Sequence, residues 1–305
     1  MNSSTTQPAP ERSFLAKIFI SPEEPRLRAG WRLILQTAMM LVFTVIVSIG
    51  MAPLILVLQG SALLILSQVA EFIVLGASIY IARRFLDKRS VESLGLRLDG
   101  FVTKDLLVGI GITFVIMGLI YLAMSSVGWI TFEGFAWQFE PIPTVVGGVF
   151  TFLVVFLFVG WNEELLSRGY HLQTIASGTN LFWGVVLSSA VFGLLHLGNP
   201  NATWVSALGI FFAGLFLAYG YLRTGQLWLS IGLHIGWNFF EGVVFGFPVS
   251  GLDIYRLTRI QVHGPEMWTG GAFGPEAGLI VLPALLIGAG LIFLYTRGRK
   301  SNDRA

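Results

Sequence analysis

Eight apolar stretches follow one another along this 305-residue chain, separated by short polar segments. Each is close to the ~20 residues that an α-helix needs to cross a bilayer. The pattern therefore predicts an all-α fold, a polytopic membrane protein built as a bundle of about eight transmembrane helices. The predicted spans are residues 33–56, 63–82, 106–127, 144–161 and beyond, 181–197, 205–222, 227–247 and 277–296.

Lys and Arg gather in alternate loops and near both ends of the predicted bundle. The loop 128–141 contains neither, and the loop 251–275 has only Arg256 and Arg259. By the positive-inside rule, we expect both termini to be cytoplasmic. The residues that set this orientation are Arg26, Arg28, Arg32, Arg83, Arg84, Lys88, Arg89, Arg97, Lys104, Arg223, Arg297, Arg299, Lys300 and Arg304.

The composition excludes several classes of site. Hydrophobic residues make up 54% of the chain and charged residues 12%, about half of the ~25% of an ordinary soluble protein. The chain has no cysteine, so disulfides, thiolate zinc sites and cysteine nucleophiles are excluded. The net charge of +2 gives no sign of a nucleic-acid surface.

A pair of adjacent carboxylates follows the uncharged run 143–161 and provides the strongest functional lead. Burying one carboxylate near the centre of a transmembrane helix costs about 2.5–3.5 kcal/mol on insertion scales. Arg168 lies one helical turn after Glu164, so we expect these two side chains to pair. Glu163 points about 100° away from Glu164 and is free to face another element.

Two further polar clusters lie on later spans. His196 ends the fifth span, and His234 and Asn238 lie one turn apart on one face of the seventh. If the fourth span stays helical to about residue 176, an antiparallel hairpin brings Glu164 and His196 within about one turn of each other. The three clusters can then share the cytoplasmic half of the membrane.

Simpler interpretations exist for each polar feature. The carboxylate pair with its arginine is also typical of a solvated turn, and a membrane histidine often bonds only to a backbone carbonyl. Glu71 in the second span and Glu241 in the seventh are expected to be structural or solvent-facing. The occurrence of three polar clusters at compatible depths favours a common site.

Glutamate, histidine and asparagine together suit hydrolysis of an amide. A carboxylate that is shielded from water is a competent general base, and a neighbouring histidine can help it to orient a water molecule. A second histidine with an asparagine can donate hydrogen bonds to a developing oxyanion. One carboxylate and two histidines also form a three-ligand zinc set, so a metal enzyme with Glu163, His196 and His234 as ligands is the alternative.

In this order and on separate spans, three motifs resemble those of the CAAX proteases and bacteriocin-processing enzymes (CPBP) family. They are Glu163-Glu164 with Arg168, Phe192 with His196, and His234 with Asn238. This family contains the type II CAAX prenyl endopeptidases and their prokaryotic relatives, also called Abi proteins. The resemblance covers residues 143–247. It implies an intramembrane endopeptidase of eight helices.

The resemblance also implies a role for each motif residue. Glu163 would activate water together with His196, and His234 and Asn238 would stabilise the oxyanion. Glu164 and Arg168 would orient the site. A glutamate-dependent mechanism without a cofactor is favoured, with zinc as the alternative.

The chain divides by this interpretation into a polar cytosolic arm (1–29), three motif-free spans (30–142), a CPBP-like catalytic core (143–247), and a loop, last span and basic tail (248–305). The implied partners are the lipid bilayer and a peptide or protein substrate, membrane-anchored or prenylated in the type II enzymes; no nucleic acid is expected. The implied location is a prokaryotic cell membrane.

Two other functions remain open at this point. A non-catalytic immunity or regulatory protein could use the same polar cluster to bind a partner, and a transporter could use it as a proton relay. The sequence shows no repeated halves and no matching pair of broken helices, which argues against a transporter.

Overall fold

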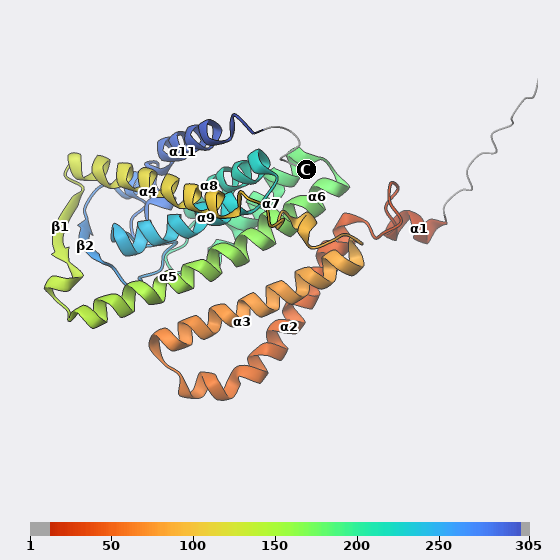
Figure 1. The fold of residues 1–305 in the computed structure, drawn as a ribbon, viewed down its shortest axis with the longest axis horizontal. Helices are drawn as coiled ribbons and strands as arrows, with labels where there is room; N and C mark the ends of the chain where they lie inside the picture. Colours follow the sequence, from red (N-terminus) through yellow and green to blue (C-terminus); the bar gives the residue numbers. More distant parts are fainter. Residues whose placement is uncertain (1–12, 300–305) are drawn as a thin grey trace, which may run out of the picture.

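The computed structural model describes residues 13–299, and this part of the chain is mostly helical (Figure 1). Six helical stretches within it are long and apolar enough to cross a membrane, which confirms the predicted all-α polytopic fold. They comprise α2 (Ala29–Val57), α3 with its extension (Gly60–Leu86), α4 (Val102–Ser126), α5 continued through α6 (Ile142–Gly178), α7 with its last turn (Leu181–Gly198) and α8 (Trp204–Thr224). Residues 1–12 of the predicted arm and Lys300 and Arg304 of the tail lie outside the described residues.

The seventh and eighth predicted spans are shorter helices. The seventh is α9 (Trp228–Asn238), which continues as a π-helix, Phe239–Val244. The eighth is α11 (Val281–Thr296). All eleven residues of α9 are buried, so this helix forms the centre of the bundle.

The central helix lies directly against α4 because both present glycines at the contact (Figure 1). A Cβ atom at Gly236 would lie 2.2 Å from Thr113 Oγ1, and one at Gly232 would lie 2.3 Å from the carbonyl oxygen of Leu106. Small residues let transmembrane backbones approach in this way. The approach fixes the depth and rotation of α9, and with them the positions of its polar side chains.

Helices α2 and α3 form a hairpin that leans away from the other helices (Figure 1). Within the long α2, only Arg32 and Gln36 are buried. In α3 the buried residues all lie in the second half, from Val74 to Ile79. The loop end of this α2–α3 hairpin therefore has few contacts with the bundle.

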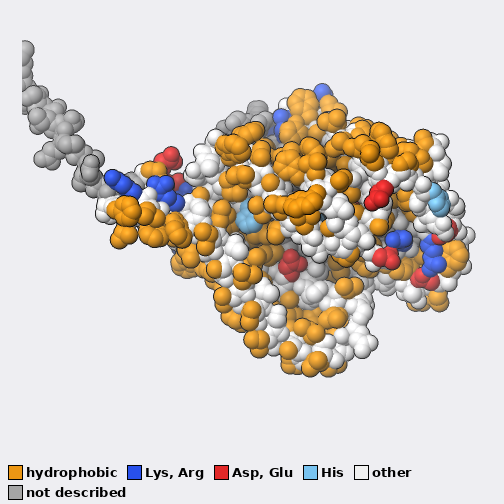
Figure 2. Space-filling view, turned by 180° about the vertical axis from the view of Figure 1, so that it is seen from behind, with side chains coloured by type: hydrophobic (Ala, Val, Ile, Leu, Met, Phe, Trp, Pro, Cys, Tyr) orange, Lys and Arg blue, Asp and Glu red, His pale blue; other side chains and the backbone are white. Residues whose placement is uncertain are grey.

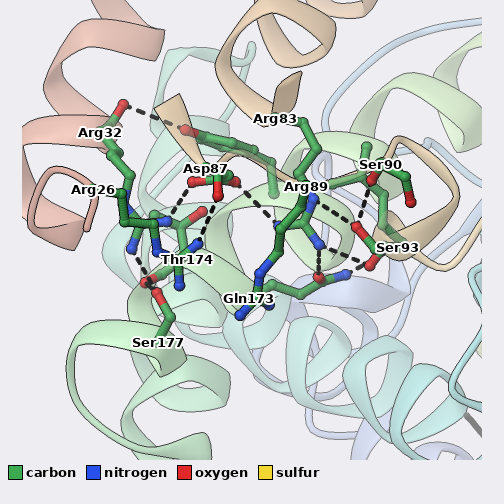
Figure 3. A network of polar contacts seen from close by, with 12 residues as sticks. Arg26, Arg32, Arg83, Asp87, Arg89, Ser90, Ser93, Gln173, Thr174 and Ser177 are labelled. Carbon is green, nitrogen blue, oxygen red and sulfur yellow. Dashed lines mark hydrogen bonds and ion pairs between the residues drawn. The ribbon is translucent and has the colours of Figure 1, made fainter. Parts of the chain in front are cut away.

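A network of buried charges attaches the hairpin at its other end (Figure 3). The Asp87 carboxylate accepts hydrogen bonds from Arg32 and, at 3.1 Å, from Nη1 of Arg83. The same two arginines reach the polar segment after α5: Arg32 donates to Oγ of Ser177 at 2.7 Å and Arg83 to Oε1 of Gln173 at 2.7 Å. This Asp87 network joins α2, the end of α3 and α6 (Gln173–Gly178).

Two short strands lie in loops that the sequence pattern assigned no regular structure. Strand β1 (Ile130–Phe135) pairs antiparallel with β2 (Thr258–Val262), with a register shift between Phe132 and Gly134. The pairing joins the loop before α5 to the long loop after α9. The remaining elements are short: α1 (Phe14–Phe19), α10 (Glu266–Thr269), the π-helical turn Ala82–Leu86 and the 3₁₀ turns Glu92–Leu94, Ala136–Gln138, His196–Gly198 and Pro275–Ala277.

Candidate active site

Glu164 and Arg168 form the ion pair that their spacing predicts. Glu164 ends α5 (Ile142–Glu164), and Arg168 lies in the π-helical segment Leu165–Leu172 that follows. Nη1 of Arg168 donates to Oε1 of Glu164 at 2.8 Å, and both side chains are almost completely buried. Nη2 of Arg168 donates to the carbonyl oxygen of Gly214 at 2.9 Å. The pair is thus tied to α8 as well as to its own helix.

His234 on α9 makes a second contact with the same carboxylate. Its Nδ1 lies 2.8 Å from Oε1 of Glu164, which is a hydrogen-bonding distance. Because this oxygen also accepts from Arg168, the Nδ1 of His234 carries the proton of the bond. Its Nε2 lies 3.7 Å from Oε2 of Glu163. The sequence pattern did not predict the bond between His234 and Glu164.

His196 approaches Glu163 from the end of α7 (Leu181–Leu195). Its Nδ1 lies 2.8 Å from the carbonyl oxygen of Phe192, so in the neutral ring Nδ1 carries the hydrogen and Nε2 has a free lone pair. That Nε2 lies 3.7 Å from Oε2 of Glu163. A separation of 3.7 Å is too long for a direct hydrogen bond and is compatible with a bridging water.

The two histidines and Glu163 face one cavity of about 560 Å³. Asn238 also lines it, and its side chain has no hydrogen-bond partner among residues 13–299 although it is 6% exposed. The Oε2 atom of Glu163 is likewise without a hydrogen bond within this part of the chain. The structure thus brings together all six predicted site residues: Glu163, Glu164, Arg168, His196, His234 and Asn238.

A further carboxylate in the cavity wall was not predicted. Glu276 lies in the 3₁₀ turn before α11 and is 4% exposed. Its Oε1 accepts from Nε1 of Trp237 at 2.9 Å, and its Oε2 accepts from the backbone nitrogen and hydroxyl of Ser250 at 2.8 and 2.7 Å. Burial raises the pKa of the Glu276 carboxyl, and the bonds from Ser250 oppose that rise. Its position in a loop, outside any motif, gave no signal in the sequence.

Glu241, expected to be structural or solvent-facing, is fully buried near Glu276. Neither of its carboxylate oxygens has a hydrogen bond within residues 13–299. It lies in the π-helix after α9, one turn beyond Asn238. The solvent-facing interpretation of Glu241 is therefore wrong.

The donor chemistry of Glu163, His196 and His234 suits zinc. Zinc needs nitrogen and oxygen ligands at about 2.0–2.2 Å around one point. Among residues 13–299, no three His, Asp or Glu side chains are placed to hold a metal ion. The side chains as they lie therefore do not form a complete three-ligand zinc set.

Comparisons with known proteins identify the segment that carries the site. Residues 145–240 match the family model of the type II CAAX prenyl endopeptidase Rce1-like domain. The chain is also 27% identical over 124 residues, 40% of its length, to the Bacillus subtilis (strain 168) protein named "Putative membrane peptidase YdiL". The match spans about half of that relative, 49% of its length. No solved structure matches the chain significantly. The predicted resemblance to the CPBP family is confirmed.

Proposed function

We propose that this membrane protein, whose residues 145–240 form a type II CAAX prenyl endopeptidase Rce1-like domain, is an intramembrane endopeptidase that uses Glu163 to activate water. The observation that carries the proposal is the position of Glu163 Oε2. It lies 3.7 Å from Nε2 of His196 and 3.7 Å from Nε2 of His234, faces the cavity, and has no hydrogen bond in the described chain. A water molecule there could donate to Glu163 and to the lone pair of His196.

The proposed reaction begins with proton transfer from this water to Glu163. The water oxygen attacks the carbonyl carbon of the substrate's peptide bond, and the carbonyl oxygen becomes an oxyanion. Glu163 then delivers the proton to the amide nitrogen, the carbon–nitrogen bond breaks, and a carboxylic acid and an amine leave. Proton transfer by a positioned side chain contributes about 10²–10⁴-fold to rates of this kind.

His234 and Asn238 are proposed to stabilise the oxyanion. The Nδ1 proton of His234 is committed to Glu164, so its Nε2 can donate when the ring carries a second proton. The unpartnered amide of Asn238 offers a second donor. Donors held in place before the reaction stabilise developing charge without reorganising.

Glu164 and Arg168 are proposed as positioning residues. Arg168 neutralises Glu164, and Glu164 holds the ring of His234 in one orientation through Nδ1. The guanidinium of Arg168 also lies over the ring of Phe192, 4.4 Å from its centroid. Phe192 supplies the carbonyl oxygen that orients His196. One buried cation therefore supports the positions of both histidines.

The test is turnover of fluorogenic peptides by the purified protein in detergent, with cleavage sites located by mass spectrometry. We expect wild type and Glu266→Gln to cleave a peptide at the same bond, since Glu266 is exposed in the loop segment α10. Glu163→Gln keeps the shape and removes the base, so its turnover should be undetectable or strongly reduced. Equal turnover by Glu163→Gln would disprove the role of Glu163.

We also propose the orientation in which both termini are cytoplasmic, based on the distribution of Lys and Arg. Epitope tags at positions 3 and 303 should be protected from protease added outside intact cells and become cleavable after the cells are opened. A tag at position 264, in the loop after β2, should be cleaved in intact cells. Cleavage of either terminal tag from outside would overturn the orientation.

A further inference from the structure

Glu71 lies where two cavities of the structure meet. It is an exposed residue near the middle of the helical stretch Gly60–Leu86, on the α2–α3 hairpin. It lines the active-site cavity and also a second, apolar cavity of about 370 Å³ between α2 and α3. In Figure 2 an acidic side chain lies in the hollow between the α2–α3 hairpin, at the bottom of the view, and the rest of the molecule. Glu71 lies outside the segment 145–240 and has no role in the mechanism above.

Glu71 has no polar partner in the part of the chain that the structure describes. Among residues 13–299 its carboxylate has no hydrogen bond and no ion pair, and no described Lys or Arg lines either cavity. It is also close enough to Glu163 for the two carboxylates to repel each other. An unpaired carboxylate near the centre of a membrane span costs about 2.5–3.5 kcal/mol, and such residues are most often functional.

The surroundings of Glu71 are rich in hydrogen-bond acceptors that lack donors. Gln68, one turn before Glu71, lines the same cavity, and its Oε1 is buried without a hydrogen bond. Oε2 of Glu163 is in the same condition. Ser167, 3% exposed, also lines the cavity, and its hydroxyl can accept as well as donate. A ligand that supplies several N–H donors and a positive charge would satisfy this group.

We propose that Glu71 is a specificity-determining residue that binds the cationic side chain of a Lys or Arg residue in the peptide substrate. The proposal rests on the endopeptidase function and adds the class of substrate. A cation beside Glu71 would also reduce the repulsion between Glu71 and Glu163. Charge pairs gain strength in a partly dry cavity because the effective dielectric constant is low there. An acidic side chain at the same place would meet carboxylates and no compensating Lys or Arg.

The experiment uses fluorogenic peptides that differ at one position, which is Lys, norleucine or Glu. The comparison is repeated with the varied position placed at each site on both sides of the cleaved bond. Lys and norleucine have similar shapes, so their comparison isolates the charge. At the best position we expect wild type to cleave the Lys peptide with a kcat/KM at least ~10-fold above that of the norleucine peptide, mainly through a lower KM.

Three variants locate this preference. Glu71→Gln should lower kcat/KM for the Lys peptide to nearly that for the norleucine peptide, and should leave kcat/KM for the norleucine peptide unchanged. Glu71→Lys should reverse the order, with the Glu peptide cleaved faster than the Lys peptide. Glu266→Gln removes the same charge from an exposed loop and should keep the wild-type preference. No charge preference in wild type, or a full preference in Glu71→Gln, would overturn the proposal.

A binding measurement separates this proposal from the endopeptidase function. Fluorescence anisotropy of labelled Lys and norleucine peptides is followed with wild type and Glu71→Gln in the same detergent. If no peptide is cleaved, the endopeptidase function fails. The charge proposal is then tested by binding alone: wild type should bind the Lys peptide more tightly than the norleucine peptide, and Glu71→Gln should bind the two equally. Equal binding of both peptides to wild type would refute the role of Glu71 by itself.

Discussion

Two carboxylates, Glu164 in the core around α9 and Glu71 on the α2–α3 hairpin, differ in their partners. In the core, Glu164 is fully buried and its Oε1 oxygen accepts from both Arg168 and His234. On the hairpin, Glu71 lies in the middle of a span without any partner from residues 13–299. Glu164 is therefore held in place before any ligand binds, whereas Glu71 is an acceptor without a partner among residues 13–299. If both proposals hold, fixed chemistry and substrate recognition lie on different elements of the fold.

The largest effect expected in the core is that of Arg168→Ala. The change leaves Glu164 as a buried carboxylate without its permanent cation, and breaking such a pair typically costs about 3–5 kcal/mol. We expect a large fall in melting temperature together with loss of turnover. Arg256→Ala is the control: it removes an arginine whose partner Asp253 is exposed, and it should change neither the melting temperature nor the turnover. A stable, active Arg168→Ala would show that the core does not depend on this pair.

A smaller effect is expected where the hairpin is attached. In Asp87→Asn the two arginines of the Asp87 network keep their other acceptors, among them Ser177 and Gln173. We therefore expect a loss of about 1–3 kcal/mol, the cost of leaving buried donors partly unsatisfied. The exposed Glu92→Gln is the matched control.

The hairpin should also become more mobile in Asp87→Asn. Because the chain has no cysteine, spin labels can be placed at Leu56→Cys and Phe150→Cys alone, both at exposed positions on α2 and α5. The distance distribution between them should broaden in Asp87→Asn and stay as in wild type in Glu92→Gln. An unchanged distribution would mean that other contacts hold the hairpin.

The smallest effect is expected from metal removal. Because no three His, Asp or Glu side chains among residues 13–299 are placed to hold a metal ion, we expect peptide turnover to be unchanged after dialysis against a chelator. Metal content is measured on the same sample before and after dialysis. Loss of turnover that one equivalent of zinc restores would replace the glutamate mechanism with a metal mechanism.

The sequence was most informative where one helix determines the geometry. The pair of Glu164 and Arg168 follows from their spacing alone. The assumption of an antiparallel hairpin between α5 and α7 likewise predicted that His196 lies at about the same depth as the carboxylates. The bond between His234 and Glu164 depends instead on the depth and rotation of α9, which its glycine contacts with α4 determine. The spacing of Gly232 and Gly236 indicates that another helix approaches closely, but it does not say which helix or in what rotation.

The features beyond the core were harder to predict for a related reason. Glu276 reaches the cavity from a loop, and the six-residue strand β1 pairs with a strand more than a hundred residues away. The α2–α3 hairpin leans away because much of its surface has no contact with the other helices. An apolar helix has the same sequence pattern whether it faces lipid or protein, so the sequence does not predict this arrangement. Glu71 could therefore be located in a span but not at a cavity.

The central claim is that Glu163 supplies the base while the ion pair of Glu164 and Arg168 beside it holds the fold. It is tested most directly by measuring peptide turnover and melting temperature on one preparation of Glu163→Gln in one detergent. The account predicts a turnover at least ~10²-fold below wild type with a melting temperature equal to or above that of wild type, because a neutral amide is easier to bury than a carboxylate. Turnover close to wild type in this variant would contradict the account.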